Sequence, residues 1–283
     1  MAEAVGVVGG GIMGSGIAEV AARSGCDVLI LEVDEARCTA TRERLERSLG
    51  KAVKVGKLDE AERDATLQRI RYTQAYEDFA DRTLVIEAII EDEQLKTTAF
   101  ATLDKVVADP EAILASNTSS IPIQKLAAAT GRPDRVIGLH FFNPVPVLPL
   151  VELIPSLLTS PETLERARRF AADQLGKQTV LAKDRAGFVV NALLIPYLLS
   201  AVRMVEGGFA TPEDVDAAMV GGCAHPMGPL ALADLIGLDT CAAVGTSMYE
   251  EYKEPLYAPP PLLLRMVEAG LLGRKSGRGF YTY

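Results

Sequence analysis

The chain has 283 residues, a formal net charge of −9, and 48% hydrophobic and 24% charged residues. This length favours two domains, and the composition is typical of a soluble globular protein. The acidic surplus argues against a nucleic acid partner, because a phosphate backbone requires a basic surplus. The four cysteines, Cys26, Cys38, Cys223 and Cys241, show no metal-like spacing. Free thiols and the lack of a basic, apolar leader predict a cytoplasmic protein without a metal site.

A glycine-rich turn, GGGIMG at residues 9–14, connects an apolar segment at 4–8 with a helical pattern. In a dinucleotide site, Gly9 would permit the tight turn and Gly11 would let the backbone approach a pyrophosphate. Gly14 would let the helix pack closely on the strand. The phosphates would lie at the N-terminus of that helix. Because glycine turns are common, simple chain reversal stays the alternative interpretation.

A second expected strand at 28–31 is followed by Glu32, close to the spacing of roughly 20 residues at which a ribose-binding carboxylate occurs. A carboxylate there accepts hydrogen bonds from a 2′-hydroxyl and repels a 2′-phosphate. Glu32 therefore favours NAD over NADP as the cofactor. Asp34 and Arg37 lie close to Glu32 in the sequence and make the distinction between NAD and NADP less sharp. The alternative interpretation of Glu32 is a solvated residue at the end of the strand.

Strand-like and helix-like segments alternate through the first two thirds of the chain, which predicts βαβ units with a parallel sheet. Further strands are expected at 84–90, 113–116, 136–139, 150–154 and 179–182. A helical stretch from Asp34 to Ile70, broken near Gly56, predicts a helical hairpin inserted into the sheet domain.

After Lys183 the strand signal fades, and the first helix is expected over 186–205. The predicted fold is α/β: a Rossmann-type, mostly parallel sheet domain over 1–184 with the hairpin insertion, followed by an all-α C-terminal domain over 185–283. The apolar run at 186–202 contains Pro196 and other breaks, so we interpret it as a buried core helix and expect no membrane association.

His140 lies at the end of an expected strand, where open α/β sheets bind their ligands. A histidine there can take up a hydroxyl proton as hydride leaves, because imidazole accepts protons near neutral pH. Glu152 lies in an apolar run, where an unpaired carboxylate would be costly. An imidazolium N–H would be a suitable partner for it. A purely structural role for His140 is the alternative.

Two further polar features lie in apolar surroundings. The segment SNTSS at 116–120 follows the strand at 113–116; one of its residues is expected to cap the next helix, and the others could bind a ligand. Asn191 is the one strongly hydrogen-bonding side chain in its helix, so it requires an internal polar partner or a substrate oxygen.

Together, six segments between Val5 and Tyr281 resemble the short-chain L-3-hydroxyacyl-CoA dehydrogenase family, in particular its bacterial 3-hydroxybutyryl-CoA branch. They are GGGIMG at 9–14, SNTSS at 116–120, GLHFFNPVP at 138–146, GFVVN at 187–191, PMGP at 226–229 and GRGFY at 277–281. The resemblance implies an NAD-dependent oxidoreductase that interconverts an L-3-hydroxyacyl-CoA and a 3-oxoacyl-CoA such as acetoacetyl-CoA.

The resemblance also implies roles for individual residues. His140 would be the catalytic base and Glu152 its orienting carboxylate, while Ser119 and Asn191 would contact the reacting 3-oxygen and the thioester. The further cofactor contacts would be Ile12, Met13, Glu91, Lys96, Ser119, Asn143 and Lys275. The coenzyme A phosphates would lie near Lys51, Lys54 and Lys57, for which a solvated basic face is the alternative. A homodimer through the C-terminal helical domain is expected.

Two positions depart from the family pattern. Glu32 stands where aspartate is frequent, and Pro149 stands where many relatives carry lysine, which could alter the acyl preference. Two other functions stay open. One is a dehydrogenase of a free 3-hydroxy acid, although such relatives often rely on a catalytic lysine. The other is a non-catalytic NAD(H)-binding protein. In such a protein, the polar residues Glu152 and Asn191 would have no evident role in their apolar segments.

Overall fold

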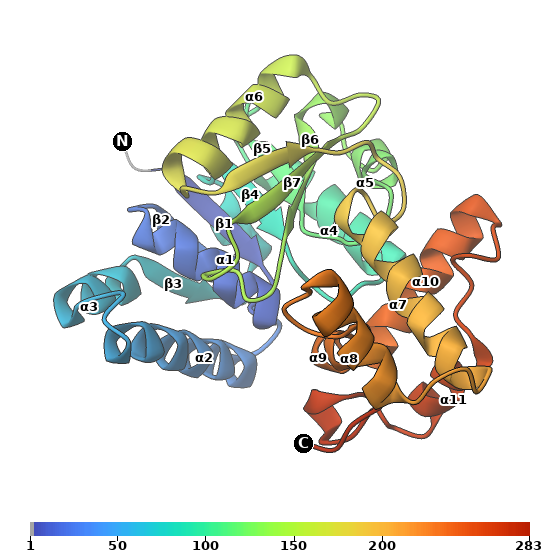
Figure 1. Ribbon diagram of the computed structural model, residues 1–283. Coiled ribbons are helices and arrows are strands. Elements are labelled where there is room, and N and C mark those ends of the chain that lie inside the picture. Colours follow the sequence, from blue (N-terminus) through green and yellow to red (C-terminus); the bar gives the residue numbers. More distant parts are fainter. Residues whose placement is uncertain (1–2) are drawn as a thin grey trace. The chain divides into compact units, whose positions relative to one another are not determined.

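The computed structural model describes residues 3–283. The chain divides into two compact units, the first ending at Asp184 and the second running from Arg185 to Tyr283. The strands of the described chain all belong to the first unit, and the second unit is helical (Figure 1).

One sheet forms the centre of the first unit, with the strand order β3-β2-β1-β4-β5-β6-β7-β8. The strands are β1 (Ala4–Val8), β2 (Asp27–Leu31), β3 (Ile70–Thr73), β4 (Leu84–Glu87), β5 (Ile113–Ser116), β6 (Val136–Phe141), β7 (Leu150–Pro155) and β8 (Gln178–Leu181). Strands β1 to β6 are parallel to one another, β7 runs antiparallel to β6, and β8 is parallel to β7. The expected mostly parallel sheet is confirmed.

Helices cover both faces of this sheet, which is why β4, β5 and β6 are buried at every position. Helices α1 (Ile12–Arg23) and α6 (Pro161–Arg169) lie over one face, and α4 (Glu93–Val106) and α5 (Ile123–Ala128) lie over the other (Figure 1). Short helical turns complete the unit: η1 (Tyr76–Phe79), η2 (Pro133–Arg135) and a π-helical turn η3 (Phe170–Gln174).

The expected helical hairpin is present as α2 (Glu35–Lys54) and α3 (Glu60–Gln68). Each helix begins at an aspartate whose carboxylate accepts a backbone N–H of the first turn: Asp34 from Arg37, and Asp59 from Glu62. Gly56, in the connection between them, has a φ of +71°. The left-handed conformation that glycine tolerates thus separates the two helices.

Two predicted boundaries were wrong in the first unit. The helical stretch does not reach Ile70, which instead begins β3 and pairs with Val28. Burial of Ile70 beside β2 overrides the helical pattern at that point. Strand β4 stops at Glu87 because the Glu87 carboxylate accepts the Ile89 N–H and turns the chain.

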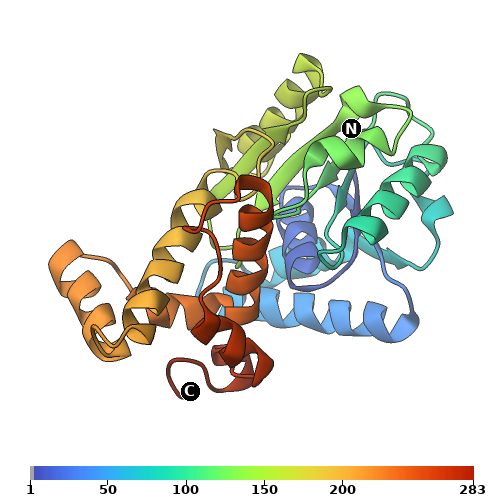
Figure 2. The same cartoon turned by 90° about the vertical axis from the view of Figure 1, so that its right-hand side faces the viewer.

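The second unit is built from α7 (Val190–Glu206), α8 (Pro212–Cys223), α9 (Pro229–Ile236), α10 (Leu238–Tyr252), α11 (Pro261–Glu268) and the short turn η4 (Arg274–Ser276). Helices α7 and α10 pack side by side (Figure 2). Their contact buries Leu199 and Met248 in the core of this unit. The expected all-α architecture is confirmed.

Helix α7 begins four residues later than predicted. Gly187 and Phe188 have φ values of +84° and +47°, and a right-handed helix cannot contain this left-handed backbone. Asn191 therefore lies in the first turn of α7 and not in its interior. Among the described residues, no single helix is long and apolar enough to cross a membrane; α9 and α10 reach that size only as a pair bent by 95°.

Candidate active site

The glycine turn has the geometry of a phosphate-binding loop. Gly9 has a φ of +92°, and its N–H donates to the Leu31 carbonyl at 2.9 Å. A Cβ at Gly14 would lie 1.8 Å from the Gly9 carbonyl oxygen, whereas a Cβ at Gly11 would meet no atom within 4 Å. Within the described chain, no side chain caps the start of α1 and its first turn holds no acidic residue. The first N–H groups of α1 are therefore suited to an anion.

Glu32 and α2 hold this turn from the side of β2. The Glu32 carboxylate is buried, and its Oε1 accepts the Gly10 N–H at 2.7 Å and the Thr41 hydroxyl at 3.3 Å. Thr41 Oγ1 and Arg44 Nη1 donate to the Gly10 carbonyl at 3.0 and 2.8 Å. Sequence reasoning missed Thr41 and Arg44. Their spacing of three residues, which puts both on one helix face, is the signal that could have found them.

His140 and Glu152 form a buried pair across two neighbouring strands. They face each other in the antiparallel register of β6 and β7, and His140 Nδ1 lies 2.7 Å from Glu152 Oε2. Because a carboxylate only accepts hydrogen bonds, Nδ1 carries the proton and Nε2 of the neutral ring is an acceptor. Nε2 lies 3.2 Å from Ser119 Oγ. The structure thus brings together three of the four residues expected to perform the chemistry.

The fourth, Asn191, belongs to the second unit, as does Lys275. Lys275 lies in η4, where its Nζ donates to the Asp239 carboxylate at 2.6 Å. In the first unit, Ile12 and Met13 form the start of α1, and Asn143 is exposed in the loop between β6 and β7.

Glu91 binds the loop that carries Ser119. Its Oε1 accepts the Ser119 and Ser120 N–H groups at 3.0 and 3.1 Å, as well as the hydroxyls of Thr118 and Ser120. Lys96 Nζ lies 3.3 Å from its other oxygen. Burial alone would raise the pKa of Glu91, but the Lys96 charge and these hydrogen bonds outweigh burial and lower it. Glu91 is therefore a carboxylate at neutral pH.

This lowered pKa makes a pH-dependent contribution to stability that is lost in acid. A folded-state pKa below the ordinary value of 4.5 stabilises the folded protein above that value, and the stabilisation disappears as the pH falls through the lower pKa. We expect wild type to melt at a higher temperature than Glu91→Gln at pH 7, and the difference between the two melting temperatures to shrink as the pH falls below 4.5. A constant difference from pH 7 to pH 3 would contradict this assignment.

The loop after β5 and the helix that follows it are fixed by Asn117, from the segment singled out at 116–120, and by Asp184, for which sequence reasoning predicted no such role. Asn117 Oδ1 accepts the Phe141 N–H at 2.9 Å and so braces the end of β6 next to His140. The expectation that a residue of 116–120 caps the next helix was wrong. The Asp184 carboxylate does so, since it accepts the N–H groups of Ile123 and Gln124 at 2.8 and 2.7 Å.

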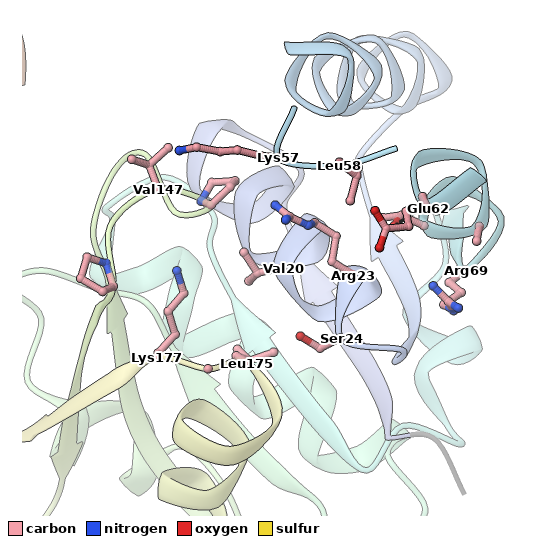
Figure 3. A pocket seen from close by; sticks show the side chains of 15 residues that line it. Val20, Arg23, Ser24, Lys57, Leu58, Glu62, Arg69, Val147, Leu175 and Lys177 are labelled. Carbon is pink, nitrogen blue, oxygen red and sulfur yellow. Dashed lines mark hydrogen bonds between the residues drawn. The ribbon is translucent and has the colours of Figure 1, made fainter. Parts of the chain in front are cut away.

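A basic cavity of about 620 Å³ lies in the first unit, between the end of α1, the hairpin and the loop after β6. Figure 3 shows Arg23, Lys57 and Lys177 around it, with Arg69 and Glu62 at one side. Burial and the Arg23 charge lower the pKa of Lys177. Of the three hairpin lysines expected to bind phosphates, only Lys57 lines this cavity. The other two, Lys51 and Lys54, lie along a separate groove with Glu43 and Glu46.

Three of the four cysteines are buried, and Cys223 is exposed. Cys26, Cys38 and Cys241 are buried, and burial raises the pKa of Cys26 to about 11 and of Cys241 to about 12. These thiols are neutral and unreactive at physiological pH. Within residues 3–283, no group of three or more His, Cys, Asp or Glu side chains could hold a metal ion.

Comparisons with known proteins relate both units to one family. Residues 4–185 match the model of the 3-hydroxyacyl-CoA dehydrogenase NAD binding domain, and residues 187–283 match that of the 3-hydroxyacyl-CoA dehydrogenase C-terminal domain. The chain is 63% identical to the 3-hydroxybutyryl-CoA dehydrogenase of Mycobacterium tuberculosis, over 99% of this chain and 98% of that protein.

Solved structures agree with this result. The crystal structure of M. tuberculosis FadB2 is 62% identical, with a TM-score of 0.99 over 100% of this chain and 99% of that one. The crystal structure of (S)-3-hydroxybutyryl-CoA dehydrogenase PaaH1 from Ralstonia eutropha is 45% identical in sequence, with a TM-score of 0.94. The match covers 100% of this chain and 99% of that chain. The glycine turn after β1 and the His140–Glu152 pair on β6 and β7 are consistent with these matches. The chain belongs to the 3-hydroxyacyl-CoA dehydrogenase family of enzymes.

Proposed function

We propose that the protein interconverts L-3-hydroxybutyryl-CoA and acetoacetyl-CoA with NAD(H). The observation that carries this proposal is the arrangement of Ser119 in the loop after β5, His140 near the carboxyl end of β6, and Glu152 opposite His140 on β7. It provides one proton acceptor, one carboxylate that sets its tautomer, and one hydroxyl beside the acceptor nitrogen.

The residues have distinct tasks in this reaction. In the oxidising direction, His140 Nε2 takes the proton of the 3-hydroxyl group, and Glu152 stabilises the imidazolium that forms at Nδ1. NAD, when bound, accepts the hydride from C3 of the substrate. Ser119 is placed to hydrogen-bond the 3-oxygen, because its hydroxyl lies next to the same nitrogen. In the reducing direction His140 returns the proton.

The residues around the glycine turn fit NAD. Open space at Gly11 and the uncapped N-terminus of α1 suit a pyrophosphate. Glu32, held beside the turn by Gly10 and Thr41, presents a carboxylate after β2 and favours a ribose with a free 2′-hydroxyl. We therefore propose NAD as the preferred cofactor over NADP.

For the coenzyme A phosphates we propose the basic cavity rather than the groove at Lys51 and Lys54. Arg23, Lys57, Arg69 and Lys177 line the cavity, and the one carboxylate among them, Glu62, already accepts the Asp59 N–H of the α3 capping box. In a chain with a net charge of −9, a cavity with a positive surplus favours an anionic ligand.

Lys57→Glu is expected to raise the KM for acetoacetyl-CoA by about threefold to tenfold with little change in kcat. A charge contact remote from the reacting atoms stabilises the bound substrate and the transition state equally. The thioester of N-acetylcysteamine, which has no phosphates, should show no change in KM. Lys54→Glu tests the separate groove, and Lys105→Glu on α4 is the matched control. A larger effect at Lys54 than at Lys57 would reverse the assignment.

For the oligomer we propose a homodimer through the second unit. Helix α7 exposes 74% of Leu193 and 46% of Met204 on one face, and Phe209 just beyond it is 83% exposed. A second copy of the chain would cover these apolar side chains. We expect light scattering to give twice the 30.3 kDa chain mass, and Leu193→Glu to shift the mass toward one chain. A monomeric wild type at micromolar concentration would exclude this dimer.

The function is tested by NADH oxidation with acetoacetyl-CoA, run beside NADPH and beside free acetoacetate. Rapid turnover with NADH and the ester alone is expected. Turnover of free acetoacetate at a similar rate would favour a dehydrogenase of free 3-hydroxy acids. NADH binding without turnover of any 3-oxoacyl-CoA would exclude the proposed activity and favour the non-catalytic alternative.

A further inference from the structure

Glu87 is a fully buried residue at the end of β4. Among the described residues, its carboxylate accepts hydrogen bonds from Ile89, Lys96 and Ser116. Its Oε1 accepts the Ile89 N–H at 2.7 Å and lies 2.6 Å from Lys96 Nζ, and its Oε2 accepts the Ser116 hydroxyl at 2.6 Å. The side chain of Glu87 is 0% exposed and that of Lys96 is 1% exposed. Glu87 is thus a buried carboxyl group with three fixed partners, one of which, Ser116, lies at the start of the loop that carries Ser119.

Lys96 links this buried carboxylate to Glu91. The ammonium group is 2.6 Å from Glu87 Oε1 and 3.3 Å from Glu91 Oε2. Lys96 is therefore closer to Glu87 than to Glu91, and it contacts one oxygen of Glu91. The other oxygen of Glu91 is left to accept its four donors from Thr118, Ser119 and Ser120.

Glu87 therefore supports two attachments of the loop at 116–120, in addition to the contact between Asn117 and Phe141. It holds the start of the loop directly through Ser116, and it holds the middle of the loop indirectly through Lys96 and Glu91. Ser119 lies between these attachments and the His140 ring, 3.2 Å from Nε2. A shift of about 1 Å in this loop can misplace Ser119 enough to slow the reaction by about a hundredfold.

A buried ion pair contributes little net stability, because desolvation of both charges offsets their attraction. Loss of one partner is different, since the other charge is then left buried without compensation. Without the Glu87 charge, Glu91 is the remaining carboxylate partner of Lys96 among the described residues, and Lys96 is drawn toward it. The ammonium group then competes with the loop N–H groups for Glu91.

We propose that Glu87 is a positioning residue: acting through Lys96 and Ser116, it fixes Glu91 and the Ser119 loop against His140 without contacting the substrate. The turnover part of this inference rests on the proposed function. The positioning itself does not, because it can be read from the exchange of the Ser119 and Ser120 amide protons.

The test compares Glu87→Gln with Arg82→Gln, which removes a buried charge next to the opposite end of β4. Arg82 is 2% exposed and pairs with Asp27 and Asp81 at 3.0 and 2.8 Å, so its loss destabilises the same unit elsewhere. For Glu87→Gln we expect kcat to fall by about tenfold or more, while the KM of the ester stays within about twofold. Hydrogen exchange at the Ser119 and Ser120 amides should accelerate by about tenfold or more. Arg82→Gln should lower the melting temperature but change neither kcat nor exchange at these amides.

Two results would overturn the inference: wild-type kcat and exchange in folded Glu87→Gln, or equal losses in Arg82→Gln. A wild type that does not turn over any 3-oxoacyl-CoA would refute the proposed function, and the exchange measurement would still decide on the positioning. If Glu87→Gln does not fold, Ser116→Ala removes one of the two attachments with a smaller perturbation. It should accelerate exchange at Ser119 and Ser120, and unchanged exchange in that variant would overturn the inference.

Discussion

Replacement of His140 by glutamine is expected to lower kcat by about a hundredfold to ten-thousandfold, the range that a positioned proton acceptor contributes. Glutamine keeps a polar side chain of similar reach but cannot take up a proton near neutral pH. The Kd of NADH should stay within about twofold, because His140 lies on β6, whereas the glycine turn proposed to bind the pyrophosphate follows β1.

The chain offers a matched control in its one other histidine. His225 lies in the second unit, where its Nδ1 is 3.1 Å from the Tyr197 hydroxyl. His225→Gln should retain wild-type kcat. A folded His140→Gln variant with a rate within a few fold of wild type, measured by stopped-flow NADH oxidation, would remove His140 from the mechanism.

The second large effect is expected at Glu152. A glutamine at this position can donate its amide N–H to Nδ1, which favours the tautomer with the proton on Nε2. That tautomer cannot accept the hydroxyl proton, and the imidazolium also loses its countercharge. We expect kcat to fall by about a hundredfold to ten-thousandfold.

Two controls separate this effect from unfolding and from independent roles. Glu165→Gln removes an exposed carboxylate from α6 that pairs with Arg168, and it should leave kcat unchanged. The double variant His140→Gln/Glu152→Gln should be no slower than His140→Gln, because Glu152 acts through the imidazole. Additive losses in the double variant, with melting temperatures near that of wild type, would show that Glu152 has a separate task.

Local patterns predicted the parts of the fold that have local causes. The glycine turn requires a positive φ at Gly9 and close packing at Gly14, and both requirements are properties of glycine itself. The hairpin helices begin at Asp34 and Asp59, whose carboxylates cap them within three residues. The mostly parallel sheet followed from alternating apolar segments, because buried strands in such sheets are apolar along their length.

Two of the errors occurred where a distant contact overrides the local pattern. Strand β3 is four residues long and exists because Ile70 pairs with Val28. The start of α5 is capped by Asp184, about 60 positions away in the sequence. Neither contact leaves a periodic signal near the element that it controls.

By itself, the sequence determined which residue types could perform the chemistry: a histidine at a strand end and a glutamate in an apolar run require each other, since a buried carboxylate must be paired. Only the tertiary structure decided how they are arranged. The register of β6 and β7 sets His140 against Glu152, and the bonds from Glu87, Glu91 and Lys96 set Ser119 against His140. These contacts join residues of separate strands and loops, so their geometry exists only once the sheet has formed.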